Sequence, residues 1–351
     1  MRNALIWVVI LMSSVAGVFG GNPDTLSNAI PLNYDTNFIK SYRNWMHIAA
    51  LAVGNRTDIE FTNTELDNNL KLSTNSPISY GFSLDYEWIS LEYTKTINGI
   101  ELADSRKGKT ESFSFRLGLT RQKFRFNAYY KNSQGYYIKN IEDFIPDWFD
   151  TQVNYPHFDD LRNQTYTFMV YYTFNHRKFS NMAALWQIDR QLKSAGSPVI
   201  GLVSMFEGIY SNEFHYIGDS IIVGDHYQDV KKAEYFKLGL TAGYMHTFAI
   251  KKRLYIHGGI IQGLFYNHSN LLEHLDIDER MNNTLGTSLN LRFTMGYNGK
   301  KFYGGVFYIL DSFISDLLST KYELTTHSYA RIYIGYRFYI KKRVWMKKVY
   351  L

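Results

Sequence analysis

The feature that constrains this chain most is a strict alternation of side chains near its carboxyl end, in the stretch ARIYIGYRFYI. Ala330, Ile332, Ile334, Tyr336, Phe338 and Ile340 fall on one side of it, and Arg331, Tyr333, Gly335, Arg337 and Tyr339 fall on the other. Successive side chains of a β-strand point to opposite faces, so a repeat of two residues predicts an extended strand. Each face of that strand must meet a different environment.

The same alternation recurs along most of the chain. Residues 112–120 and 124–131 both show it, and the three residues between them predict a tight hairpin. The other candidate strands are 44–54, 78–86, 88–96, 164–175, 179–191, 196–208, 235–249, 253–267, 288–297, 301–310 and 330–340. Many of them exceed the five or six residues that are usual in globular proteins and approach the length of about ten that a tilted strand needs to cross a bilayer.

The connections between these strands are unequal. Tight turns are expected near 86–88, 121–123, 175–178, 250–252 and 298–301, and long polar segments at 55–77, 97–110, 132–163, 210–234 and 268–284. Outer-membrane barrels have short periplasmic turns and longer external loops. One conflict remains, because two strands at 179–191 and 196–208 would bring the segment 210–234 out on the periplasmic side. A strand is therefore hidden or misassigned.

The polar face indicates where the strands lie. It carries Gly, Ser, Tyr and Arg, as expected for a confined aqueous lumen, and an arginine on the lipid face costs about 2–4 kcal/mol at the bilayer midplane. Arg331 and Arg337 are therefore predicted to face a lumen, and Ile332 and Ile334 to face lipid. Aromatic residues near strand ends resemble interfacial girdles: Tyr86, Trp88, Tyr244, Phe248, Tyr266, Tyr297 and Tyr308. The sequence predicts an all-β, closed antiparallel transmembrane β-barrel of about 12 strands, within a range of roughly 10 to 14.

The termini complete the predicted organisation. Arg2 precedes an apolar stretch at 4–20, which predicts a secretory signal peptide at 1–20, with an uncleaved anchor as the alternative. We expect a periplasmic lead-in at 21–43, the barrel at 44–340 and a basic tail at 341–351. The segment 330–340 also looks like the closing-strand signal of outer-membrane barrels, which would be recognised by the barrel assembly machinery. That signal usually ends the chain, whereas this chain continues to Leu351. Either the barrel closes slightly later, or the basic tail lies on an anionic membrane surface.

Composition excludes several classes of function. The chain has no Cys, which excludes disulfides, a cysteine nucleophile and zinc-thiolate sites. Its formal charge of +6 is modest and not clustered, so nucleic acid is not an expected partner. Walker-type loops and dinucleotide fingerprints are absent from the sequence, and we assign no cofactor.

Four stretches resemble an uncharacterised family of Bacteroidota outer-membrane proteins known as domain of unknown function 4421. They are FIKSYRNWMHIAAL (38–51), NSPISYGFSLDYEWISLEY (75–93), KGKTESFSFRLGLTRQKFRFNAYYKNSQGYY (107–137) and DRQLKSAGSPVIG (189–201). The chain has Arg43 where the family motif often has proline after a Ser-Tyr pair. The resemblance spans nearly the whole mature chain and implies a closed outer-membrane barrel, but it implies no activity, because none is assigned to the family.

The most unusual short motif is DRQLKSAGS, which interrupts two apolar segments. If it folds into the lumen, Arg190 and Lys193 could bind a phosphate or carboxylate, with hydrogen bonds from Ser194 and Ser197. The structural alternative is a loop whose charges pair with Asp189 and neighbouring strands. The candidate ligand-binding residues are Asp189, Arg190, Lys193, Ser194, Ser197, Arg292, Arg331 and Arg337.

Catalytic and metal sites have little support in the sequence. An acyl hydrolase would need a base beside Ser197, but His246 falls on the predicted lipid side and His257 on the lumen side, and we assign no catalytic residue. The loops 215–229 and 268–279 contain Asp and His without a standard ligand spacing, so we assign no metal site. Residues 141–160 are expected to form a short lid or plug helix over the mouth, or an external contact surface.

These observations favour a Gram-negative outer-membrane protein with a narrow, side-chain-filled polar lumen. Its expected role is structural, or the binding of a small solute or lipid, with outer-membrane lipid and lipopolysaccharide as surroundings. One alternative is an outer-membrane lipid-modifying enzyme of the acyl hydrolase type. A second is a soluble periplasmic β protein, in which the apolar face would pack inward.

Overall fold

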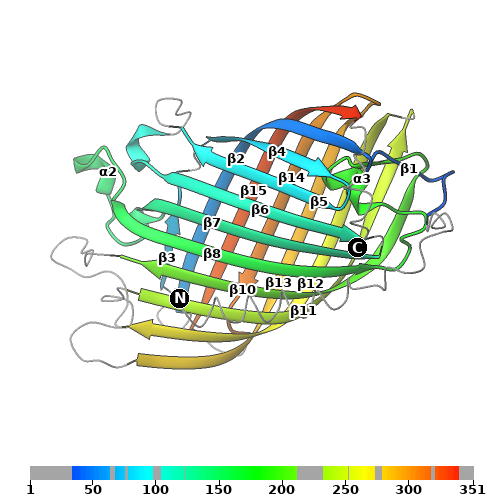
Figure 1. The fold of residues 1–351 in the computed structure, drawn as a ribbon. Coiled ribbons are helices and arrows are strands. Elements are labelled where there is room, and N and C mark those ends of the chain that lie inside the picture. The colour runs from blue at the N-terminus through cyan, green and yellow to red at the C-terminus, as the bar shows by residue number, and fades with distance from the viewer. Residues whose placement is uncertain are drawn as a thin grey trace, which may run out of the picture. The chain divides into compact units, whose positions relative to one another are not determined.

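Twelve strands close into an antiparallel ring in the computed structural model (Figure 1). The structure describes residues 34–63, 68–75, 78–97, 104–121, 123–211, 232–251, 253–272, 279–317 and 321–339. The ring consists of β2 (Trp45–Asn63), β4 (Ile78–Tyr86), β5 (Ile89–Thr96), β6 (Glu111–Arg121), β7 (Phe124–Ile138), β8 (His157–Thr173), β10 (Ala195–Tyr210), β11 (Lys232–Ile250), β12 (Leu254–Leu272), β13 (Glu279–Asn298), β14 (Phe302–Ile314) and β15 (Lys321–Tyr339). Each strand pairs with the next in this order, and β15 pairs with β2 to close the ring. The predicted fold class and strand number are confirmed.

A thirteenth strand, β3 (Asn68–Ser73), completes one part of the wall. The strands β4, β5 and β6 have only 9, 8 and 11 residues. Beyond their ends, β3 pairs with the outer part of β2 and, through Leu72 and Ser73, with β7. The adjoining loop contains the short helix η2 (Ser105–Lys107), where hydrogen bonds from Arg106 lower the pKa of Asp104 to about 2.

The two ends of the ring differ in their connections. Strands are joined at the short-turn end by residues 87–88, 122–123, 251–253 and 299–301. At the opposite, long-loop end, residues 139–156 connect β7 to β8. The turns predicted near 86–88, 121–123, 250–252 and 298–301 are therefore confirmed. At the long-loop end the strands extend further than predicted, as in β2, which continues to Asn63.

The predicted strand at 179–191 is wrong. A turn is present at 175–178 as predicted, but it leads into the interior and not into a wall strand. Residues 174–194, which we call the plug, leave the wall between β8 and β10 and enter the interior of the ring at the short-turn end. They contain α3 (Asn181–Leu185), of which every residue is buried, and β9 (Asp189–Gln191). Because the plug is not a wall strand, β10 begins at the short-turn end, and the conflict in the predicted topology disappears.

The plug is paired with the segment that precedes the barrel. Residues 35–43, which we call the strap, contain β1 (Ile39–Ser41), and β1 forms a two-stranded antiparallel sheet with β9. Hydrogen bonds from the Leu192 amide to the Phe38 carbonyl and from the Tyr42 amide to the Ile188 carbonyl extend this sheet. The strap therefore holds one edge of the plug.

The two faces of the wall have the predicted chemistry. On β15, Ile332 and Ile334 are 65% and 68% exposed, whereas Arg331 and Arg337 are 3% and 0% exposed. The same outward direction is taken by most large exposed apolar side chains of the other strands, including Tyr244, Phe248, Ile260, Leu264, Tyr266, Phe293, Tyr297 and Tyr308. An apolar exterior around a polar interior suits hydrocarbon outside the ring and contradicts a soluble β protein with an inward apolar face. No helix among the described residues is long and apolar enough to span a bilayer.

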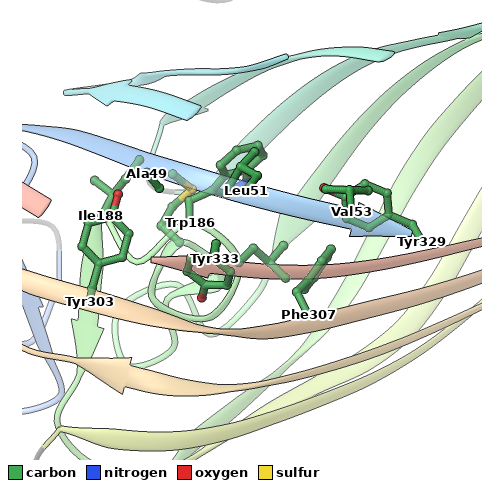
Figure 2. Close-up of a cluster of buried hydrophobic side chains, with 11 residues drawn as sticks. Ala49, Leu51, Val53, Trp186, Ile188, Tyr303, Phe307, Tyr329 and Tyr333 are labelled. Atoms are coloured by element: carbon green, nitrogen blue, oxygen red, sulfur yellow. The ribbon is translucent and has the colours of Figure 1, made fainter. Parts of the chain in front are cut away.

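Side chains fill the interior in layers. Around the plug, Trp186 and Ile188 pack among residues of β2, β14 and β15, as Figure 2 shows. At the long-loop end a second apolar cluster surrounds Tyr136 and Ile138, and the short helices η3 (Ile141–Asp143) and α2 (Trp148–Thr151) pack on it. Charged and polar side chains lie in the lumen between the two clusters, and they include Glu92, Glu207 and Arg331.

Candidate functional site in the barrel interior

The charged residues at the start of the DRQLKSAGS motif are bonded to protein groups. Asp189 accepts hydrogen bonds from Ser180 Oγ at 2.7 Å and from Arg43 Nη2 at 3.4 Å. Arg190 Nη1 donates to the Asn298 carbonyl at 3.5 Å. These contacts match the structural alternative, in which the motif's charges pair locally.

The remaining motif residues do not line a common surface. Lys193 and Ser194 are exposed, with the Lys193 ammonium 5.4 Å from the Phe38 ring centroid and Ser194 Oγ accepting from the Ala249 amide. Ser197 is buried, where its hydroxyl accepts from the Asn175 amide at 2.8 Å and donates to the Pro198 carbonyl at 2.7 Å. Ligand binding by these residues stays a prediction.

Arg337 joins the wall to the plug at the short-turn end. Its Nε lies 3.2 Å from His47 Nδ1, and its Nη2 donates to Asn298 Oδ1 at 2.8 Å. The same guanidinium also donates to the Gly299 and Gln187 carbonyls. A buried guanidinium needs its five donors satisfied. Here one carbonyl of the β13–β14 turn, one carbonyl of the plug and the side chains of His47 and Asn298 accept from it.

Arg331, also on β15, bonds the plug further from the short-turn end than Arg337 does. Its Nη2 donates to the Leu185 carbonyl at 2.7 Å, and its Nη1 forms an ion pair with Glu92. Glu92 also accepts from the Tyr329 hydroxyl at 2.6 Å and lies 3.5 Å from Arg116 Nη1. A single carboxylate on β5 thus compensates two guanidinium groups, that of Arg331, which is buried and bonds the plug, and that of Arg116, which is partly exposed.

Gln187 is the centre of the contacts between plug and wall, and it was not among the predicted site residues. Its side-chain amide donates to the Tyr333 hydroxyl at 2.6 Å and to the Tyr255 hydroxyl at 2.8 Å, and Tyr255 in turn donates to the Ala184 carbonyl at 3.0 Å. Its backbone has φ of 53°, a left-handed conformation that costs a non-glycine residue about 1–2 kcal/mol. The available signal was a single amide within the apolar run MAALWQI, because a buried polar group requires partners.

A separate charged layer lies toward the long-loop end. Lys237 Nζ is 3.2 Å from Glu207 Oε2 and 3.9 Å from Glu323 Oε1. Asn163 donates to the other oxygen of Glu207 at 2.8 Å. Lys131 Nζ donates to Thr57 Oγ1 at 2.6 Å. Paired or hydrogen-bonded charged side chains therefore fill the lumen both around the plug and between the plug and the long-loop end.

The residues considered for acyl hydrolysis are not brought together. His257 lies in the lumen, with Nδ1 2.9 Å from Thr247 Oγ1, whereas His246 lies on the outward face of β11. Ser197 bonds to main-chain groups instead of a histidine. A serine hydroxyl without a base is a weak nucleophile, so this trio does not form a hydrolytic site.

The two loops considered for metal binding fall largely outside the described residues. The segment 215–229 lies wholly outside them, and of 268–279 only 268–272 and Glu279 lie within elements that the structure describes. His268 Nδ1 is 2.7 Å from Asn283 Oδ1. Within the described part of the chain, no three His, Cys, Asp or Glu residues are grouped so that they could hold a metal ion.

The closed ring, its apolar exterior and its polar lumen define the class of protein, a transmembrane β-barrel of the bacterial outer membrane. The sequence matches the family described as "Domain of unknown function (DUF4421)" over residues 33–338, and the chain belongs to that family.

The comparison with curated proteins gave no match. Among solved structures, the chain is similar to the P. putida toluene transporter TodX, with 10% identity over 92% of this chain and 95% of that one and a TM-score of 0.27. It is similar to OmpT of Vibrio cholerae, with 7% identity over 82% and 97% and a TM-score of 0.30. It is also similar to the β domain of the Bordetella autotransporter BrkA, with 11% identity over 82% and 98% and a TM-score of 0.33. Likenesses at this level assign no activity to this chain.

Proposed function

We propose that this protein binds a small solute or lipid in a narrow polar lumen of the outer membrane and does not serve as a general pore. The observation that carries the proposal is the plug, whose α3 is wholly buried and whose carbonyls at Ala184, Leu185 and Gln187 accept hydrogen bonds from the wall. A hydrated ion entering from the long-loop end would meet bonded side chains and then this segment.

The supporting contacts come from two strands of the wall. Arg331, Tyr333 and Arg337 lie on β15, and Tyr255 lies on β12. A barrel of about 12 strands has an interior that side chains can largely fill. The plug is therefore a built part of the interior, and passage of a solute requires these bonds to break.

We further propose the placement of the chain in the cell. The short-turn end faces the periplasm, as in other outer-membrane barrels. Residues 1–20 act as a signal peptide, 21–43 as a lead-in and 341–351 as a basic tail on an anionic surface. Residues 1–33 and 340–351 lie outside the described residues. The segment 330–340 presents the closing strand to the assembly machinery, and lipopolysaccharide contacts the exterior.

Conductance in planar bilayers tests the closed state. We expect the wild-type protein to show no stable ion conductance, whereas a variant with residues 178–192 replaced by a short Gly-Ser turn conducts. Heat-modifiable migration on gels verifies that each barrel is folded. If the replacement does not fold, Gln187→Leu serves instead, because it removes the bonds to Tyr255 and Tyr333 and leaves the wall intact.

A matched change at the other end of the barrel is the control. Replacement of residues 147–151 by Gly-Ser removes α2 and does not touch the plug, so conductance should stay at the wild-type level. A wild-type protein that carries a steady ion current, unchanged by loss of the plug, would contradict the proposal.

A further inference from the structure

Besides Arg337, whose guanidinium bonds to neutral groups, two further buried arginines of the lumen have no ion-pair partner among the described carboxylates. Arg125 on β7 and Arg292 on β13 are 3% and 7% exposed. Arg116 and Arg331 share Glu92, but neither Arg125 nor Arg292 forms an ion pair with any described carboxylate. Buried charges in proteins are normally paired, because a low dielectric strongly disfavours an isolated ion.

The groups that contact these two guanidiniums are all neutral. Arg125 Nε donates to Asn127 Oδ1 at 2.9 Å, and its charge lies 5.3 Å from the ring centroid of Trp186 in the plug. Arg292 Nε donates to Asn290 Oδ1 at 2.6 Å, and its Nη2 donates to the Tyr171 hydroxyl at 3.0 Å. Amide and phenol oxygens satisfy donors, but they do not cancel charge.

Nearby carboxylates do not restore the balance. Asp311 accepts a hydrogen bond from Asn290, and Asp85 faces Ser90 across the strand ladder. Arg125 is the cross-strand neighbour of Tyr171, to whose hydroxyl Arg292 donates, so the two like charges lie close together and repel. Counted together, the four guanidiniums of Arg116, Arg125, Arg292 and Arg331 exceed the three carboxylates of Asp85, Glu92 and Asp311 by one.

A second, independent observation lies beside Arg292. His257 and Thr294 face each other on β12 and β13, and both are fully buried. Thr294 is two residues from Arg292, on the same face of β13. Among the residues that the structure describes, neither His257 Nε2 nor Thr294 Oγ1 has a hydrogen-bond partner. The Thr247 hydroxyl can donate to His257 Nδ1, and in that tautomer Nε2 carries the proton and is an unused donor. Burying a polar atom without a partner is unfavourable, because its bonds to water are lost and not replaced.

We propose that Arg125, Arg292, His257 and Thr294 bind a small oxyanion, a phosphate or carboxylate group, in the lumen next to the plug. The inference rests on the proposed solute-binding function and names the chemical class of the ligand. The planar guanidinium fork can donate two parallel hydrogen bonds to a pair of oxygens of a carboxylate or a phosphate. The imidazole N–H and the threonine hydroxyl add two further hydrogen bonds. One anion would thereby neutralise the excess charge and satisfy both unused polar atoms.

Thermal unfolding of the folded protein in zwitterionic detergent tests the site, with inorganic phosphate compared against chloride at equal ionic strength. We expect phosphate to raise the unfolding midpoint of the wild type above that in chloride. Arg125→Gln and Arg292→Gln should each weaken the apparent phosphate affinity at least about ten-fold, because each removes a charge-assisted contact. Without phosphate these two variants should lose less stability than Arg331→Gln, since each gives up bonds to neutral side chains and no carboxylate partner.

Arg331→Gln is the matched control. It removes a guanidinium that is paired with Glu92 and bonded to the plug, so it should lower the midpoint and retain the shift caused by phosphate. Vesicles of phosphatidylglycerol and of phosphatidylcholine, free of inorganic phosphate, separate a lipid headgroup from a free anion as the source. A midpoint raised only by phosphatidylglycerol, and only while both arginines are present, supports the headgroup.

The inference fails if neither phosphate nor phosphatidylglycerol produces a shift that depends on Arg125 and Arg292. It also fails if both Gln variants destabilise the ligand-free protein as much as Arg331→Gln does. Conductance is a separate readout, because a wild type that conducts and still shows the arginine-dependent shift would contradict the closed state and leave this site standing.

Discussion

Arginine side chains perform different tasks in this lumen, and their contacts determine which. Arg331 and Arg337 donate to main-chain carbonyls of the plug, at Leu185 and Gln187. A carbonyl acceptor is present at every residue, so these bonds fix the path of the plug backbone and depend little on its side chains. Arg125 and Arg292, by contrast, contact neutral side chains.

Substitution of Glu92 should lower the free energy of unfolding strongly. Glu92→Gln keeps the shape of the side chain but removes the carboxylate with which Arg331 and Arg116 form ion pairs. Breaking a buried ion pair by removing one partner typically costs about 3–5 kcal/mol. We expect a loss of that size in the free energy of unfolding, measured by urea titration in lipid vesicles.

Glu60→Gln is the comparison for that measurement. Glu60 pairs with Lys71 at 3.5 Å, and both side chains are partly exposed. Exposed ion pairs contribute about 0–1 kcal/mol, so this variant should unfold close to the wild type. Equal urea midpoints for the two variants would argue that Glu92 is not the compensating charge.

At the level of elements, alternation was sufficient to predict the wall and misleading for the plug. A strand between lipid and lumen must alternate, and nearly every wall strand was found in this way. The run at 179–191 is apolar because the interior of the ring surrounds it on all sides, and a buried helix and a buried strand need similar side chains. The mismatch in strand direction was the one sequence signal that this segment is not part of the wall.

The contacts between side chains in the interior could not be predicted from the sequence, for a different reason. Arg331 was predicted to face the lumen, but its partner Glu92 lies 239 positions away along the chain. That pairing follows from ring closure, which brings β15 beside β2 and near β5. Local periodicity gives the direction of a side chain, and only the closed ring gives its neighbour.

The sheet between strap and plug can be tested through one amide. Leu192→Pro removes the hydrogen bond from that amide to the Phe38 carbonyl. We expect faster hydrogen exchange in residues 186–191 and 38–42, with β12 unchanged, measured by mass spectrometry on the folded barrel. Leu192→Val keeps the donor and should exchange like the wild type. Identical exchange in the proline variant would mean that the strap does not stabilise the plug.

At the scale of the whole molecule, the apolar outward face of the wall determines that the barrel is stable in a lipid bilayer. Ile334 is 68% exposed on the outward face of β15. Ile334→Arg places a charge against hydrocarbon and should destabilise the barrel by about 2–4 kcal/mol at the midplane. Folding into vesicles, followed by heat-modifiable migration across a urea series, measures the effect.

Ile334→Leu controls for the change of shape, because it keeps the apolar surface and should fold with the wild-type midpoint. An arginine variant that folds into vesicles as well as the leucine variant would argue that this face does not contact lipid.

Closure of the ring by β15 also fixes the order in which the interior is completed. The strap is the first described segment to be synthesised, and it can pair with the plug as soon as residue 192 exists. Arg331, Tyr333 and Arg337 arrive only with the last strand. The plug therefore lacks its bonds to β15 until the last strand is in place. Closure of the ring and fixation of the plug then occur together, late in folding.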